Sequence, residues 1–163
     1  MEPDKPSEAL RDLTDEPKAI VVAVDASAIA PGVVSMATRI SRSMPSATIH
    51  VVHVFRTSRL DRARAGAPPT NNTDMIEEAK DHLAYHVRTL QRSTRATVIG
   101  HLEMGDPASE VLRMVASLAA DLLIVGTHDY VGFERFLLGS VAETLMRKAG
   151  CPVLVVRPKS HSH

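Results

Sequence analysis

The segment with the clearest chemical potential lies between two glycines in the C-terminal third of the chain. Gly126 follows the apolar run at residues 122–125, and Gly139 with Ser140 begins a stretch of helical periodicity. A helix N-terminus carries unpaired N–H groups and a partial positive charge, and glycine lets an anion approach the backbone closely. A strand, a glycine-containing loop and a helix start therefore predict a site for a phosphate. An unliganded helix cap is the alternative, because serine is a favoured capping residue.

Alternating strands and helices are predicted to position this loop. The continuous apolar, β-branched run at residues 19–24 predicts a strand buried on both faces, and further strands are predicted at residues 48–55, 96–99, 122–125 and 153–156. Apolar stripes at helical spacing predict helices at residues 27–43, 73–92, 107–118 and 140–149. Asp106 followed by Pro107 is a strong helix start, with aspartate as the N-cap and proline at the first helical position.

The alternation predicts an α/β fold, a single doubly wound parallel sheet of five strands with helices on both faces. Ligands of such sheets bind beyond the C-terminal ends of the strands, where the strand order reverses. Asp25, Val54, Phe55 and the Gly126 loop all lie at the C-terminal ends of predicted strands. We therefore expect them around one crevice. Asp25 alone could equally be a helix cap or a loop acceptor.

Composition argues against several function classes. The chain has 163 residues, a formal net charge of zero and few aromatic side chains, so nucleic acid and membrane surfaces are not expected partners. No run reaches the roughly 18 apolar residues of a membrane span. The single cysteine, Cys151, cannot form an internal disulfide, which fits a cytoplasmic protein. Residues 1–17 read as a flexible arm, and residues 159–163 read as a short tail.

Four segments, in order and at matching separations, resemble the universal stress protein family. They are residues 20–27, residues 50–54, the turn at residues 105–107, and the block from Val125 to Val156 with its Cys151-Pro152 pair. The resemblance covers roughly residues 18–158, which we take as one universal stress protein domain. It implies strand order 3-2-1-4-5, an adenine-nucleotide alpha-hydrolase-like fold and a homodimer formed through the last strand. It also implies a stress-response module that binds ATP or another adenine nucleotide.

The resemblance assigns roles to particular residues. Asp25 would face the ribose beside Val24, the backbone of Val54 would meet adenine, and Gly139 with Ser140 would present N–H groups and a hydroxyl to phosphates. The full set of nucleotide contacts that the resemblance implies is Ala23, Val24, Asp25, Val54, Val125, Gly126, Thr127, His128, Asp129, Gly139, Ser140 and Val141.

Asp129 departs from the family pattern, in which the loop reads Gly, two residues, Gly, nine residues, Gly, then Ser or Thr. Here Asp129 replaces the middle glycine. Two unit charges about 4 Å apart repel by roughly 4 kcal/mol at an effective dielectric near 20, a loss of about a thousandfold in affinity. The carboxylate could rotate away, Mg²⁺ could bridge it to a phosphate, or the ligand could carry fewer phosphates.

The alternative function is a dimeric interaction protein of the same family that binds no nucleotide. An enzyme, at most a slow ATPase, is the weakest reading, since no P-loop is present.

The remaining polar clusters are weaker candidates. His82 and His86 lie four residues apart on one helix face, a spacing that suits two metal ligands, but two surface histidines are the expected reading. His50 and His53 should point to opposite faces of their strand. Basic residues open the loop after the second strand, and a solvated charge run or a phosphate cover would each explain them. They are Arg56, Arg59, Arg62 and Arg64.

Overall fold

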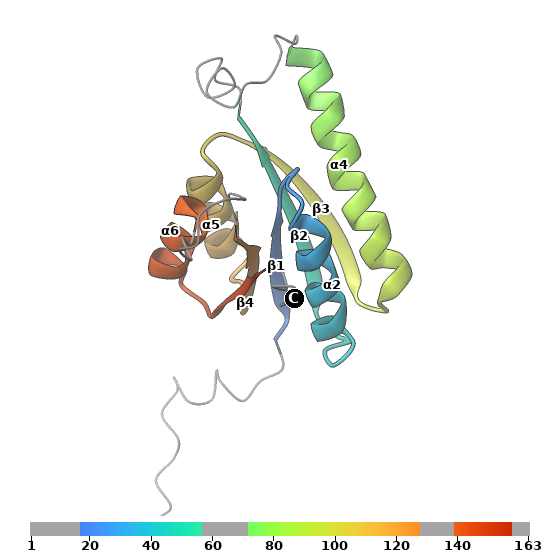
Figure 1. The fold of residues 1–163 in the computed structure, drawn as a ribbon. Helices are drawn as coiled ribbons and strands as arrows, with labels where there is room; N and C mark the ends of the chain where they lie inside the picture. The colour runs from blue at the N-terminus through green and yellow to red at the C-terminus, as the bar shows by residue number, and fades with distance from the viewer. Residues whose placement is uncertain (1–16, 57–71, 128–138, 158–163) are drawn as a thin grey trace, which may run out of the picture.

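The computed structural model describes residues 17–56, 72–127 and 139–157. Five strands and four helices alternate in this part of the chain (Figure 1). They run in the order β1 (Ala19–Val24), α2 (Ala30–Ser41), β2 (Thr48–Phe55), α4 (Asn72–Ser93), β3 (Thr97–Met104), α5 (Pro107–Ser117), β4 (Leu122–Gly126), α6 (Ser140–Lys148) and β5 (Val153–Val156).

All strand pairs are parallel, and the sheet order is β3-β2-β1-β4-β5. The fold class and the strand order expected from the sequence are therefore confirmed. The central strand β1 is almost wholly buried, because its two neighbours occupy both edges and helices cover both faces. The strand order reverses between β1 and β4, so a crevice is expected at their C-terminal ends.

Two layers of helices enclose the sheet (Figure 1). On one face, α2 and α4 pack against Ile20, Val22 and Ile49. On the other face, α5 and α6 pack against Val21 and Leu123. Neighbouring residues of β1 thus belong to opposite cores, as the alternation of side chains along a strand requires. No helix among the described residues is long and apolar enough to cross a membrane.

The third strand is longer than predicted. We expected it at residues 96–99, but β3 pairs with β2 from Thr97 through Met104. This edge strand contains Gly100, His101 and Glu103, which break the apolar run, and several of its side chains are exposed. Backbone pairing with the largely buried β2 extends the strand beyond the apolar pattern that predicted it.

The helix starts differ in how well the sequence predicts them. Asp106 is the N-cap of α5, and its carboxylate accepts from the Ser109 N–H at 3.0 Å, as expected. The first helix was predicted to begin near Ser27 but begins at Ala30. The Ser27 N–H donates to the Asp25 side chain instead, so the intervening residues form a turn rather than helix.

Candidate functional site

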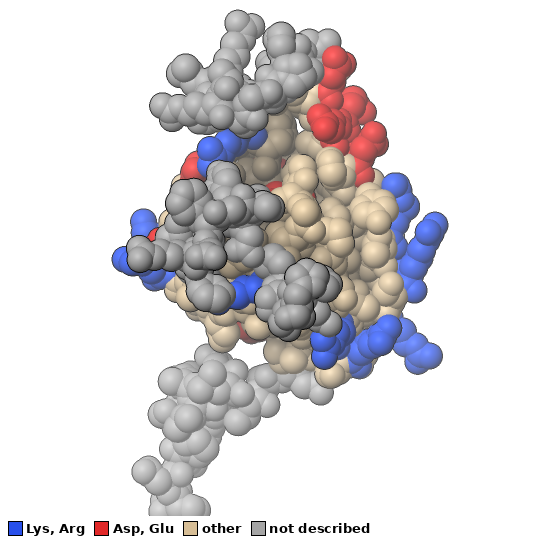
Figure 2. Space-filling model, in the orientation of Figure 1, with Lys and Arg blue, Asp and Glu red and all other residues tan. Residues whose placement is uncertain are grey.

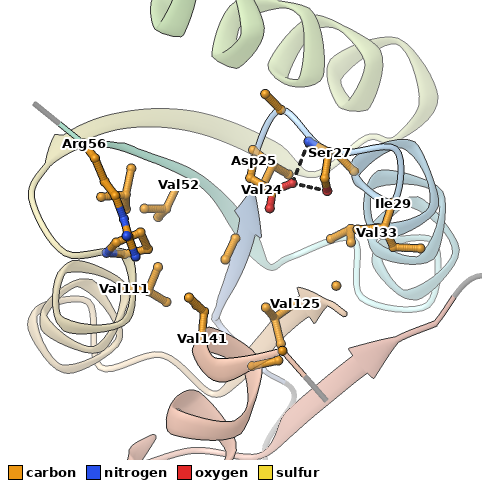
Figure 3. A pocket seen from close by; sticks show the side chains of 18 residues that line it. Val24, Asp25, Ser27, Ile29, Val33, Val52, Arg56, Val111, Val125 and Val141 are labelled. Atoms are coloured by element: carbon orange, nitrogen blue, oxygen red, sulfur yellow. Dashed lines mark hydrogen bonds between the residues drawn. The ribbon is translucent and has the colours of Figure 1, made fainter. Parts of the chain in front are cut away.

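A cavity of about 570 Å³ lies at the C-terminal ends of β1, β2 and β4, beside the point where the strand order reverses (Figure 3). Its wall is continued by the first turns of α2, α5 and α6. The volume falls within the range of small-molecule sites. The position is the one that the topology of a doubly wound sheet predicts for a ligand.

Asp25 is the carboxylate on this wall. It follows the last residue of β1, and one of its oxygens accepts from the Ser27 N–H at 3.0 Å and from the Ser27 hydroxyl (Figure 3). These two bonds fix the orientation of the half-buried side chain. A carboxylate held in this way is a suitable acceptor for vicinal sugar hydroxyls.

Valine side chains form most of the remaining wall. Val52 and Val54 come from β2, Val111 from α5, Val125 from β4 and Val141 from α6 (Figure 3). The strand valines are there because β-branched residues favour buried parallel strands. Together they make an apolar slot that suits a flat heterocyclic base better than a charged group.

Gly126 has a steric role in this site. A Cβ at this position would lie 2.7 Å from Ile29 Cγ2 and 2.9 Å from Val33 Cγ2. Both distances are shorter than van der Waals contact allows. The absence of a side chain therefore lets the first turn of α2 approach the end of β4, and Ile29 and Val33 line the cavity as a result.

Gly139 is the N-cap residue of α6 and lines the cavity. Because glycine has no side chain, Gly139 cannot form a side-chain hydrogen bond to the first N–H groups of the helix. The first N–H groups of a helix have no intrahelical partner and carry partial positive charge. They are suitable donors to an anion. Glu143 in the first turn is paired with Arg147 at 2.8 Å, which offsets its charge.

Arg56 supplies positive charge to the wall. It immediately follows β2, lines the cavity and is exposed. Its Nη2 lies 3.9 Å from Asp106 Oδ1, so its guanidinium stands near the start of α5. We predicted a basic loop start here, and the structure places Arg56 at the cavity. Arg59, Arg62 and Arg64 lie outside the described residues.

The structure gathers most of the sequence-predicted site residues at this cavity. Those on its wall are Ala23, Val24, Asp25, Val54, Val125, Gly126, Gly139 and Val141. Thr127 and Ser140 are not on the wall. The Thr127 N–H donates to the Val156 carbonyl oxygen at 3.0 Å, its hydroxyl is buried without a described partner, and Ser140 is exposed. His128 and Asp129 lie outside the described residues.

Several wall residues were not predicted from the sequence as site residues. Ile29, Val33, Pro107 and Val111 come from helices and were recognised only as core or capping positions. The apolar stripe of a helix indicates which side chains face inward, but it does not distinguish a core contact from a cavity wall.

The prediction of two surface histidines on α4 is wrong for His86, which is 4% exposed. The rings of His53, His82 and His86 form a stack, with centroids 6.2 and 6.4 Å apart. His86 is buried because α4 packs against α2 as well as the sheet, so its buried face is wider than the apolar stripe. Within the described residues, no group of three or more His, Cys, Asp or Glu side chains is arranged to hold a metal ion.

Hydrogen bonds and burial determine which protonation state the buried histidines favour. His53 Nδ1–H donates to the Val24 carbonyl oxygen at 3.1 Å, and His50 Nδ1 lies 2.9 Å from His101 Nε2 on the opposite face. Burial lowers the pKa of His50, His53 and His86 from the ordinary value of 6.5, so their neutral forms are favoured at neutral pH. Burial raises the pKa of the Cys151 thiol, consistent with an apolar packing role.

Comparison with known proteins shows which family has this architecture. The family model described as the universal stress protein family matches residues 16–157. A universal stress protein of Methanocaldococcus jannaschii is 31% identical over 144 residues, which cover 86% of this chain and 82% of that protein.

Solved structures give the same result. A structure of hypothetical protein MJ0577 aligns with a TM-score of 0.74 at 22% identity, over 90% of this chain and 99% of the other, which shows the shared fold. The universal stress protein from Archaeoglobus fulgidus in complex with dAMP aligns with a TM-score of 0.62 at 26% identity, over 86% of this chain and 98% of the other. With the fold, the family model and the relative matched over most of its length in agreement, the chain belongs to the universal stress protein family.

Proposed function

We propose that the protein is a regulatory stress-response module that binds an adenine nucleotide in the cavity at the C-terminal ends of β1, β2 and β4. The observation that carries the proposal is the arrangement of one cavity wall. The fixed carboxylate of Asp25, the N-terminus of α6, which no described side chain caps, and an apolar slot of valines all face the same space. These three features correspond to the sugar, the phosphate and the base of a nucleotide.

We further propose that the ligand carries few phosphates. Asp129 brings a carboxylate into the loop between β4 and α6, and repulsion from a polyphosphate grows with the number of phosphate charges. The related Archaeoglobus fulgidus protein was crystallised with dAMP, a monophosphate. A monophosphate needs only the helix N-terminus, whereas ATP would need Mg²⁺ or a movement of Asp129 to offset the repulsion.

The test is calorimetric titration of the purified protein, stripped of bound ligand, with AMP, cyclic AMP, ADP and ATP, with and without Mg²⁺. We expect AMP to bind more tightly than ATP in the wild type, and the Asp129→Gly substitution to reduce or reverse that preference. Asp25→Asn should weaken binding about ten- to a hundredfold, because it removes a charged acceptor while keeping the oxygen that holds Ser27. Asp81→Asn is the matched control, since Asp81 is exposed on α4 and lies away from the cavity.

The outcomes separate the two functions considered from the sequence. Binding by Asp129→Gly but not by the wild type would mean that one carboxylate disables the cavity, which would favour the interaction protein. Failure of both to bind any of the four nucleotides would contradict the placement of the site. Equal losses in Asp25→Asn and Asp81→Asn would show that binding depends on net charge and not on the Asp25 carboxylate.

We also propose a homodimer formed through β5. This strand is at the edge of the sheet, and Val153, Leu154 and Val155 remain only partly buried in the single chain. An apolar edge strand is prone to pair with another chain. Light scattering after size-exclusion chromatography should give twice the chain mass. Val155→Lys should shift the protein towards the monomer, and a wild-type monomer at all concentrations would contradict the proposal.

A further inference from the structure

A second cavity lies in the groove between α2 and α4, apart from the nucleotide cavity. Its volume is about 340 Å³, and it shares no wall residue with the first cavity. We call it the α2–α4 groove, and its wall is formed by Pro31, Val34, Ser35, Thr38, Arg39, Arg42, Tyr85, His86, Thr89 and Ser93. This volume is near the lower end of the range for small-molecule sites, so the groove suits a compact ligand.

The charge of the groove is wholly positive. Among the described residues, Arg39 and Arg42 are the only charged members of its wall, and neither forms an ion pair with another described residue. The acidic residues of α4 lie in its N-terminal half, from Asp74 to Asp81. In Figure 2 acidic side chains gather over that end of α4, and basic side chains gather around the lower part of the molecule, where α2 and α4 end. The C-terminal end of the groove therefore attracts an anion.

Three hydroxyl groups on the wall, those of Thr38, Thr89 and Ser93, are acceptors towards a ligand. The Thr38 hydroxyl donates to the Val34 carbonyl oxygen at 2.9 Å, and the Thr89 hydroxyl donates to the Tyr85 carbonyl oxygen at 2.9 Å. The Ser93 hydroxyl donates to the Thr89 carbonyl oxygen at 2.8 Å. Each hydroxyl hydrogen is therefore engaged, and the oxygen lone pairs remain to accept from hydroxyl groups of a ligand.

His86 provides an independent indication of a ligand. Its side chain is more than nine-tenths buried, it contributes to the groove wall, and its Nδ1 has no hydrogen-bond partner among the described residues. Buried polar atoms in proteins are normally paired with protein, water or ligand. An unpaired ring nitrogen buried beneath the wall of a polar groove is explained if a water molecule held with the ligand completes its bonding.

We propose that the α2–α4 groove binds a small phosphate monoester that carries hydroxyl groups. The two guanidinium groups, Arg39 and Arg42, hold the phosphate at the C-terminal end of the groove, where paired arginines are effective phosphate ligands. The threonine oxygens bind the hydroxyl groups of the ester beside the buried His86 ring, and the exposed ring of Tyr85 covers its carbon skeleton. The site is independent of the nucleotide cavity and does not rest on the proposed function.

The test is calorimetric titration of the full chain with glycerol 3-phosphate, with inorganic phosphate and glycerol as the two halves of the ligand. We expect saturable binding in the order glycerol 3-phosphate, then inorganic phosphate, then glycerol. The double variant Arg39→Gln/Arg42→Gln should weaken glycerol 3-phosphate binding about tenfold or more. Arg88→Gln/Arg92→Gln is the matched control, because these exposed arginines on α4 carry the same charge and lie outside the groove wall.

Nuclear magnetic resonance of the histidine ring nitrogens identifies the groove directly. Glycerol 3-phosphate should shift the His86 Nδ1 signal and leave the His50 signals, on the opposite face of the sheet, unchanged. Equal weakening in the two double variants would show non-specific attraction and overturn the proposal. Binding that survives Arg39→Gln/Arg42→Gln but is lost in Asp25→Asn would place the ligand in the first cavity and would also overturn the proposal. The absence of saturable binding at millimolar concentrations would overturn the proposal too.

Discussion

Gly126→Ala tests the packing that shapes the first cavity. The substitution adds one methyl group at the end of β4, where the new Cβ would lie 2.7 and 3.1 Å from Ile29 Cγ2 and Cγ1 and 2.9 Å from Val33 Cγ2. Val33 is fully buried and belongs to the core beneath α2. The overlap cannot be relieved by one side chain swinging into solvent, so the first turn of α2 must move away from the sheet.

The expected cost is that of overpacking a tight core, about 1–3 kcal/mol in the free energy of unfolding. For a chain of this length, each kcal/mol lowers the melting temperature by about 2–4 °C. Chemical denaturation followed by circular dichroism measures the free energy, and a lower midpoint with an unchanged slope would indicate a change in stability alone. Because Ile29 and Val33 line the cavity, nucleotide binding should weaken as well.

Two other glycines provide controls for Gly126→Ala. A Cβ at Gly150 would have no atom within 4 Å, so Gly150→Ala should change stability by less than about 0.5 kcal/mol. A Cβ at Gly100 would lie 2.9 Å from Val87 on α4, away from the cavity, so Gly100→Ala should destabilise the fold without affecting nucleotide binding. In an Ile29→Ala background, which lacks two of the three close contacts, Gly126→Ala should cost less stability than it does in the wild type. A Gly126→Ala protein as stable as the wild type would refute the close approach of α2 to β4.

Two further predictions concern a helix cap and the buried histidines. Asp106→Ala should lower the unfolding free energy by about 0.5–2 kcal/mol, because it removes the cap of α5. Hydrogen bonds from Ser109 lower the pKa of Asp106 in the folded state. The difference in unfolding free energy between the variant and the wild type, measured by denaturation at several pH values, should therefore narrow as the pH falls below the ordinary pKa of 3.8. Burial lowers the pKa of His50, His53 and His86 in the folded state. Their contribution to the unfolding free energy should therefore be complete above pH 6.5 and be lost on acidification below it. Each histidine should lower the unfolding free energy by at most about 1.4 kcal/mol per pH unit. A stability profile that is flat between neutral pH and pH 5, or unchanged in slope in His86→Gln, would contradict the second prediction.

The sheet was predictable because its strands are buried on both faces. A run such as residues 19–24 contains no polar residue, and in a parallel sheet only such runs avoid burying unpaired polar side chains. The same pattern predicts Asp25, Val54 and Gly126 at one end of the sheet. The apolar pattern did not predict the second half of β3. An edge strand with one exposed face can carry Gly100, His101 and Glu103 without burying unpaired polar side chains.

The helical part of the site was less predictable, since a sequence does not reveal how many neighbours a helix has. Residues of α4 at spacing three and four were assigned to a single buried face, which left His86 on the solvent side of Leu83 and Leu90. The helix contacts α2 in addition to β2 and β3, and the second contact buries the flank on which His86 lies. A polar residue on the flank of an apolar stripe is exposed when its helix packs against one layer and is buried when the helix packs against two. The α2–α4 groove follows from the same second contact, and so its polar wall could be recognised only from the structure.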